Sequence, residues 1–121
     1  MIELVQGGGV TSPKGFVAGG TFAGLKTKED DTLDLGILIS ETPANVAATF
    51  TTYKVVSPSV TLSRQRASKG TARGVVANSG CANCCVGGPG LSDAVEMASL
   101  AANHAGCSDD DLLVCSTGMI G

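Results

Sequence analysis

Two short segments carry side chains whose types and spacing could do chemistry. One is Ser116–Gly118, which reads Ser-Thr-Gly after an apolar stretch, and the other is Asn78–Cys85, which is rich in amides and thiols. A hydroxyl residue followed by glycine at the end of a buried strand can direct a side-chain O–H and a backbone N–H at one point, as an oxyanion hole requires. Ser-Thr-Gly is also common in ordinary turns, and the pattern alone favours that simpler interpretation.

The Asn78–Cys85 segment has two interpretations that its residues do not separate. Its amides and hydroxyl can line a cleft, or hold a neighbouring loop by hydrogen bonds. The same residues are also typical of an Asx-type turn that leads into a helix.

Five cysteines are present, and Cys81-Ala-Asn-Cys84 has the spacing of metal and redox motifs. No second Cys-x-x-Cys occurs in the sequence, and Gly87–Gly90 separates these thiols from the next helix, whereas redox cysteines sit at a helix N-terminus. We therefore predict no metal site, and we expect buried, inert thiols. His104, the only histidine, is expected on the surface near a helix C-terminus.

The elements that would position the two polar segments form a strand–helix–strand unit. The first strand starts at Arg73, the helix spans Leu91–Ala105 with apolar residues at helical spacing, and Gly106 supplies its C-terminal cap. The second strand is Leu112–Cys115. A unit of this length predicts a parallel crossover, which brings both polar loops to the same edge of a sheet, where ligands bind in open parallel sheets.

The N-terminal part of the chain is expected to be mainly extended. Leu33–Ile39 and Val46–Tyr53 are predicted to form an antiparallel pair joined by a turn at Thr42–Asn45. Further extended segments are expected at Met1–Val5 and Phe16–Lys26.

Two shorter helical segments are also predicted. Ser57 caps a helix that ends near Ala67, with Pro58 at its first position and basic residues in its last turn. Ser108–Asp111 resembles a capped single helical turn.

The composition gives this chain few rings with which to build a core. There are 17 glycines, no tryptophan, one tyrosine and three phenylalanines in 121 residues, which we interpret as a single domain over residues 1–121. Such a core must consist of aliphatic side chains and buries less apolar area per residue. We infer that the chain relies on another chain or segment for part of its burial.

Charge and hydropathy argue against several classes of function. The net charge is −3 and no basic stripe occurs, which argues against nucleic-acid binding. The sequence has no apolar run of the length that a membrane span needs, and its start does not resemble a signal peptide. A cytoplasmic protein with reduced thiols is therefore expected.

Five motifs in a fixed order resemble the glutamate N-acetyltransferase family, the bifunctional ornithine acetyltransferases of arginine biosynthesis. The resemblance covers essentially all 121 residues. The motifs are Gly9–Phe16, Ala48–Thr52, Val76–Asn83, Gly90–Ala94 and Cys115–Gly121.

The resemblance implies an α/β fold that is part of a layered αββα sandwich like that of N-terminal-nucleophile hydrolases, with a mixed sheet. It implies a precursor that cleaves itself into α and β chains, where the new N-terminal threonine of the β chain is the nucleophile. That threonine takes acetyl from N2-acetyl-L-ornithine and passes it to L-glutamate through an acetyl-threonine intermediate. Thr117 would give its O–H and Gly118 its backbone N–H to the oxyanion hole.

The same resemblance implies partner chains, and this sequence also departs from the family motif at several points. The partners are the remainder of the α chain and the β chain, in a higher oligomer of αβ units, without a resident cofactor; acetyl-CoA is an acetyl donor in bifunctional members. Here Cys81 and Cys84 replace an Asn and an Ala of the usual loop, and the Ala-Thr-Met-Leu type of cleavage site is absent. We therefore expect an N-terminal α-chain fragment that is inactive alone.

Two other functions stay open from the sequence. One is a related self-processing aminopeptidase or amidohydrolase of the same fold, and the other is a small thiol- or zinc-binding module.

Overall fold

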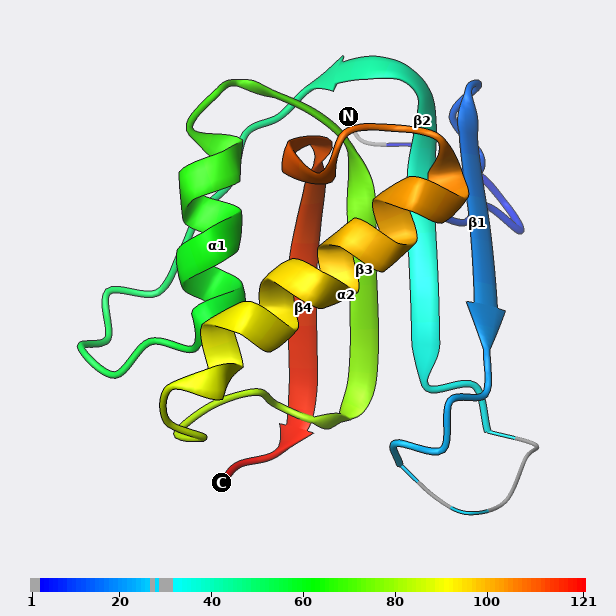
Figure 1. The fold of residues 1–121 in the computed structure, drawn as a ribbon. Coiled ribbons are helices and arrows are strands. Elements are labelled where there is room, and N and C mark those ends of the chain that lie inside the picture. Colours follow the sequence, from blue (N-terminus) through cyan, green and yellow to red (C-terminus); the bar gives the residue numbers. More distant parts are fainter. Residues whose placement is uncertain (1–2, 27, 29–31) are drawn as a thin grey trace.

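The computed structural model describes residues 3–26, 28 and 32–121 (Figure 1). In these residues four strands form one sheet in the order β1-β2-β3-β4. β1 to β3 pair antiparallel, and β3 and β4 pair parallel, so the sheet is mixed as predicted. The elements are β1 Phe16–Thr21, β2 Leu35–Asn45, α1 Pro58–Ala67, β3 Thr71–Cys81, α2 Pro89–Ala105, the 3-10 helix η1 Asp109–Asp111 and β4 Leu112–Met119.

The predicted crossover is confirmed as β3–α2–β4. The helix buries Ala94, Ala98 and Ala102, and side chains this small let it lie close against the sheet. Gly106 caps α2 in the left-handed conformation at φ 66°, as the sequence predicted. The crossover is the element that sets β3 beside β4 in parallel register.

Helix α1 also forms where the sequence predicted it, and it is bonded to β4. The Ser57 hydroxyl accepts a hydrogen bond from the Val60 N–H, and Pro58 occupies the first helical position. Ser63 Oγ accepts from the Val114 N–H at 2.8 Å and donates to the Val114 carbonyl at 2.7 Å. Arg66 Nη1 donates to the Leu112 carbonyl at 2.8 Å. These side chains satisfy backbone groups along the outer edge of β4.

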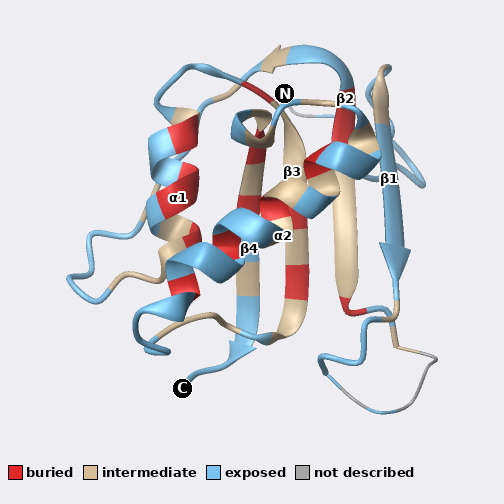
Figure 2. Cartoon of the chain, viewed as in Figure 1, coloured by how far each residue is buried: buried red, intermediate tan, exposed pale blue. Residues whose placement is uncertain are grey.

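Helix α2 crosses one face of the sheet and α1 lies beside the edge strand β4, and the core forms between these helices and the sheet (Figures 1 and 2). It consists of small and aliphatic residues, namely Leu62, Val76, Ala94, Ala98 and Val114 in one cluster and Ile39, Ala102 and Leu112 in another.

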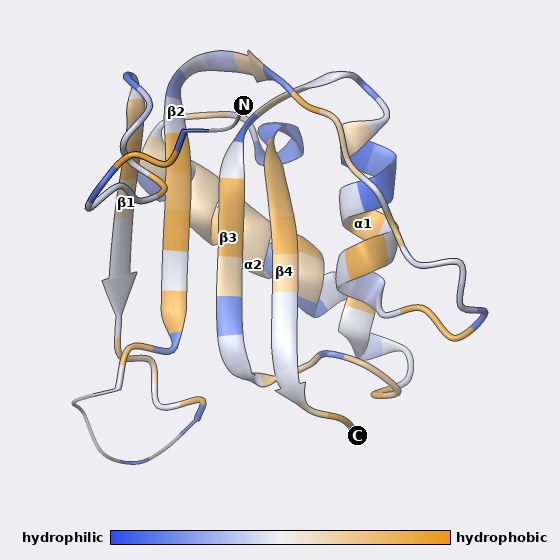
Figure 3. Ribbon diagram, turned by 180° about the vertical axis from the view of Figure 1, so that it is seen from behind, coloured by the Kyte–Doolittle hydropathy of each residue, from blue (hydrophilic) through white to orange (hydrophobic). Residues whose placement is uncertain are grey.

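No helix among the described residues covers the opposite face, which Figure 3 views directly. Val75 lies there beside its strand partners Leu38 and Leu113, and all three stay only partly buried, whereas Val76 is 3% exposed. The core of this chain is therefore one-sided.

The predicted antiparallel pair in the N-terminal half is wrong. β2 continues through the expected turn at Thr42–Asn45 with a register shift between Ile39 and Ala44, and it pairs with β1 and β3 instead. The segment Val46–Tyr53 forms no strand. A segment with strand propensity forms a strand only where it can pair with a sheet edge. The extension of β2 already pairs with β3, so residues 46–53 find no free edge there.

Residues 46–53 instead run outside the sheet, next to α1. The Arg64 guanidinium lies 5.4 Å from the centre of the Phe50 ring and donates to the Thr51 carbonyl at 3.0 Å.

Two other expected extended segments differ in the structure. Glu3–Val5 is not a strand, and Met1 and Ile2 lie outside the described residues. The segment predicted at Phe16–Lys26 is a strand only to Thr21, because the chain then turns toward Asp34.

Replacement of Ser63 by alanine tests how α1 is attached to β4. The variant leaves the buried N–H and carbonyl of Val114 without their partner, which should lower the free energy of unfolding by about 1–3 kcal/mol. Denaturant unfolding measures this loss. Ser68→Ala is the matched control, because Ser68 bonds to Gln65 at an exposed position, and an equal loss in both variants would contradict the role of Ser63.

Candidate active site

The two polar segments lie side by side, but as paired strands rather than loops. β3 runs on to Cys81 and β4 to Met119, with Ser79 opposite Thr117 and Gly80 opposite Gly118. The sequence predicted their proximity correctly and their conformation wrongly. The reason is that each segment supplies the ladder partner of the other, which composition alone does not reveal.

Close backbone contact requires glycine at both paired positions. Gly80 and Gly118 have φ of 124° and 130°, a region that other residues rarely adopt. A Cβ atom at Gly118 would lie 2.5 Å from the carbonyl oxygen of Gly80, and one at Gly80 would lie 2.5 Å from the carbonyl oxygen of Leu25. Three backbone segments are therefore stacked here, and we call them the glycine stack: Leu25–Lys26, Gly80–Cys81 and Gly118.

Thr117 lies on the face that the helices leave open. Ser116 is on the helix side, where its hydroxyl accepts a hydrogen bond from Ser59 of α1 at 3.1 Å. Because side chains alternate along a strand, Thr117 projects to the other face, and it is exposed.

Asn78 near the end of β3 and Asn83 in the β3–α2 connection both bond to backbone carbonyls. Asn78 Nδ2 donates to the Cys81 carbonyl and Asn83 Nδ2 donates to the Gly90 carbonyl, each at 2.8 Å. The Ala82 N–H donates to the Met119 carbonyl at 2.9 Å. The side-chain bonds of both amides are therefore local, and only the backbone bond of Ala82 reaches β4.

Asp34 is a residue that the sequence reasoning missed. Its side chain is buried, and the carboxylate accepts hydrogen bonds from the N–H groups of Ala23 and Leu25 at 2.6 Å and of Lys26 at 3.0 Å. Burial alone would raise the pKa of Asp34, but these bonds outweigh it and hold the pKa below its usual range. One feature of the sequence could have pointed to Asp34: it is a charged residue at the start of a strand that is otherwise apolar.

The expectation of buried thiols is wrong. Cys81, Cys85 and Cys115 are exposed, and Cys84 and Cys107 are partly exposed, because they lie on the open face or in connections. Hydrogen bonding to Cys85, whose sulfur lies 3.8 Å away, and burial both raise the pKa of the Cys84 thiol.

Among the residues that the structure describes, no group of three or more Cys, His, Asp and Glu could hold a metal ion.

An apolar cavity of about 440 Å³ lies elsewhere, between α2 and strands β1 and β2. His104, exposed near the end of α2 as predicted, is one of the few polar side chains in its lining. The cavity is on the helix side of the sheet, away from Thr117.

In the described parts of the chain, neither helix has the length and hydropathy of a membrane-spanning segment.

Comparison with known sequences identifies the family. Residues 17–121 match the sequence model of the ArgJ family. The chain belongs to the ArgJ family. A relative named arginine biosynthesis bifunctional protein ArgJ, from Caldanaerobacter subterraneus subsp. tengcongensis, is 46% identical over 120 residues, which are 99% of this chain and 29% of the relative. The chain thus spans less than a third of the length of that ArgJ protein.

Two solved structures share the fold. The crystal structure of ArgJ from Bacillus halodurans matches with a TM-score of 0.89 and 36% identity, over 97% of this chain and 60% of that one. The structure of ornithine acetyltransferase complexed with ornithine, from Mycobacterium tuberculosis, matches with a TM-score of 0.85 and 36% identity, over 97% and 63%. The predicted family and the α/β fold, part of a sandwich like that of N-terminal-nucleophile hydrolases, are confirmed.

The lowered pKa of Asp34 predicts how stability depends on pH. A carboxyl whose pKa is lower in the folded state stabilises the fold above its unfolded pKa, near 4, and this contribution is lost as pH falls through the folded value. The unfolding temperature should therefore drop as the pH falls below about 5, and Asp34→Asn should make that drop smaller.

Asp110→Asn provides the control for that pH series. Hydrogen bonding to Lys69 also lowers the pKa of Asp110, but this carboxylate is exposed and water screens its ion pairs with Lys69 and Arg66. A pH slope that Asp34→Asn leaves unchanged, or that Asp110→Asn reduces more, would contradict the assignment.

Proposed function

We propose that this chain is part of an acyltransferase of arginine biosynthesis that moves acetyl from N2-acetyl-L-ornithine to L-glutamate. Thr117 and Gly118 form its oxyanion hole. The single observation that carries this role is the glycine stack, which fixes a backbone N–H next to an exposed hydroxyl at the end of β4. Membership of the ArgJ family and the likeness to an ornithine acetyltransferase in complex with ornithine support the choice of reaction.

The backbone direction of β4 supports the role of Gly118. Leu112 and Val114 direct their backbone groups to α1, away from β3. Every second residue of a strand points its N–H and C=O to the same side, so continuation of this alternation brings the Gly118 N–H to the outer edge of β4. There the N–H is not needed for the β3–β4 ladder and is free to act as a donor.

The proposed reaction runs in two acyl-transfer steps. The hydroxyl of a threonine at the N-terminus of the β chain attacks the acetyl carbonyl of N2-acetyl-L-ornithine, and its own amino group takes the proton. The oxyanion that forms accepts hydrogen bonds from the Thr117 O–H and the Gly118 N–H. Ornithine leaves with the proton, and the amino group of glutamate then attacks the acetyl ester through a second oxyanion, which restores the threonine.

This mechanism assigns the nucleophile to another part of the enzyme. The working unit is this segment with the remainder of the α chain and the β chain, assembled as a higher oligomer of αβ units. No resident cofactor is needed for either step, and acetyl-CoA serves only as an alternative acetyl donor where the enzyme is bifunctional.

Substitution of Thr117 in the complete enzyme tests the oxyanion hole. Thr117→Val keeps the size of the side chain but removes the O–H, so kcat for acetyl transfer should fall by about 10²- to 10³-fold. Thr117→Ser keeps a hydroxyl and is the matched control, with most of the activity retained. Steady-state assays of both variants decide the role, and normal turnover of folded Thr117→Val would overturn it.

The choice of substrate needs a separate assay. The complete protein should form ornithine and N-acetylglutamate from N2-acetyl-L-ornithine and glutamate, and mass spectrometry should find one acetyl group on the N-terminal threonine of its β chain. Release of amino acids from peptides, without acetyl transfer, would instead identify the related aminopeptidase activity.

A further inference from the structure

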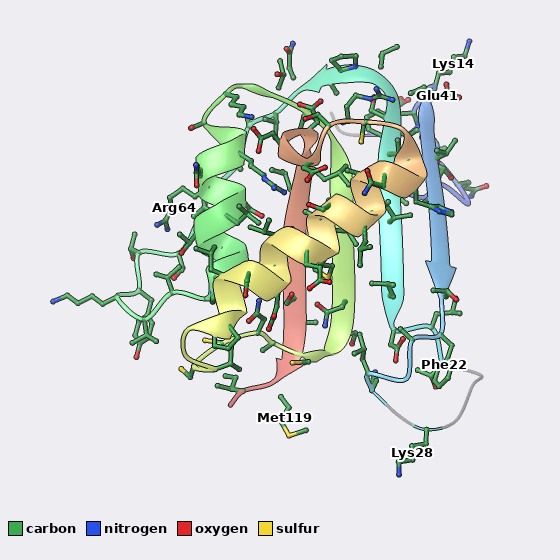
Figure 4. The ribbon with its side chains drawn as sticks, viewed as in Figure 1. Lys14, Phe22, Lys28, Glu41, Arg64 and Met119 are labelled. Atoms are coloured by element: carbon green, nitrogen blue, oxygen red, sulfur yellow. The ribbon has the colours of Figure 1, made fainter. Side chains whose placement is uncertain are left out.

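Asp34 fixes a turn of the chain that lies at the same end of the sheet as Thr117 and Gly118. Asp34 is 3% exposed, and its carboxylate accepts three hydrogen bonds from backbone N–H groups of residues 23–26. Figure 4 shows the turn, which carries Phe22, at the end of the sheet where β4 reaches Met119. A turn held by three bonds to one charged group has little freedom to move relative to that group.

Asp34 is also bonded to β3 directly before the glycine stack. Its backbone carbonyl accepts a hydrogen bond from the Ser79 N–H at 2.8 Å, and Ser79 is followed by Gly80. One residue therefore holds both the turn, through its side chain, and β3, through its main chain.

The turn and β3 meet at the glycine stack. The Leu25–Lys26 peptide lies against Gly80, where a Cβ would be 2.5 Å from the Leu25 oxygen and 2.8 Å from the Lys26 nitrogen. The peptide after Gly80 lies in the same way against Gly118, where a Cβ would be 2.7 Å from the Cys81 nitrogen. A shift of the turn would therefore be passed by direct backbone contact to Gly118.

We propose that Asp34 is a positioning residue for acetyl transfer, which presses the Leu25–Lys26 peptide on Gly80 and thereby fixes the direction of the Gly118 N–H. This inference rests on the proposed oxyanion hole. Asp34 itself touches no substrate. An oxyanion hole depends on donors that are already in place when charge develops, and small displacements of such groups reduce the rate strongly.

The chemistry of the three bonds explains why the residue is an aspartate. An ionised carboxylate offers two oxygens that only accept, so all three N–H groups find an acceptor. Asparagine has the same shape but one accepting oxygen, and its NH₂ group would face N–H donors. Asp34→Asn therefore changes the hydrogen bonds of the turn with little change in side-chain size.

Kinetics of Asp34→Asn in the complete enzyme test the proposal. We expect kcat for acetyl transfer to fall by about tenfold, with KM for both substrates within about twofold of the wild-type values, because the oxyanion donors act in the transition state. Asp110→Asn is the matched control, since it removes a carboxylate beyond the opposite end of β4, and it should leave both constants unchanged. Unchanged kcat in folded Asp34→Asn, or a change confined to KM, would overturn the proposal.

A double variant separates positioning from loss of stability. If Asp34 acts through the oxyanion pair, Asp34→Asn should reduce kcat by less in the Thr117→Val background than in the wild type, because the two donors act as a unit. Equal reductions in both backgrounds would show that Asp34 acts elsewhere.

A milder variant covers the case in which Asp34→Asn does not fold. Ala23→Pro removes the one N–H that reaches Oδ1 and leaves the buried carboxylate in place. It should lower kcat about threefold or more at unchanged KM, and wild-type kinetics would overturn the proposal. A wild-type enzyme without acetyl transfer would refute the proposed function itself, whereas an active wild type with unaffected variants refutes only the role of Asp34.

Discussion

The close approach of Gly118 to Gly80 is the contact that the other elements of this chain make possible. It requires β3 and β4 to run parallel in one register, which the α2 crossover provides. The alanine face of α2 lets that helix lie near the strands, and α1 holds the outer edge of β4 through Ser63 and Arg66. Each of these features limits how far β4 can move against β3, so the backbone around Gly118 is fixed before any ligand binds.

The proposed site lies on the face of the sheet where this chain has no core. Thr117 lies on the sheet face that the described helices leave open, and Val75 and Leu113 are only partly buried there. The ArgJ protein of Caldanaerobacter subterraneus is more than three times as long as this chain. The proposed mechanism places the nucleophile on a further segment, and this open face is where we propose that such a segment meets Thr117.

The sequence predicted those parts of the fold that depend on local pattern. Alanine periodicity with Gly106 located α2, Ser57-Pro58 located the start of α1, and strand–helix–strand spacing gave the parallel crossover. The family resemblance singled out Thr117 and Gly118, which the Ser-Thr-Gly pattern alone did not separate from an ordinary turn.

The errors of the sequence prediction concern features that depend on distant residues. Val46–Tyr53 has strand propensity, but the extension of β2 occupies the position beside β3. Thiol burial depends on which face of the sheet is covered, and no local pattern contains that information. The role of Asp34 depends on three N–H groups in the preceding turn of the backbone, eight to eleven residues earlier in the sequence.

Replacement of Gly118 by alanine in the complete enzyme tests the central claim most directly, with Gly19→Ala as its control. A Cβ at Gly118 meets the backbone of Gly80 at a positive φ, whereas a Cβ at Gly19 on β1 meets no atom within 4 Å. We predict that Gly118→Ala lowers the unfolding free energy by about 1–3 kcal/mol and removes most of the acetyl transfer, while Gly19→Ala keeps both. Wild-type stability and turnover in Gly118→Ala would contradict the close backbone contact and the oxyanion hole built on it.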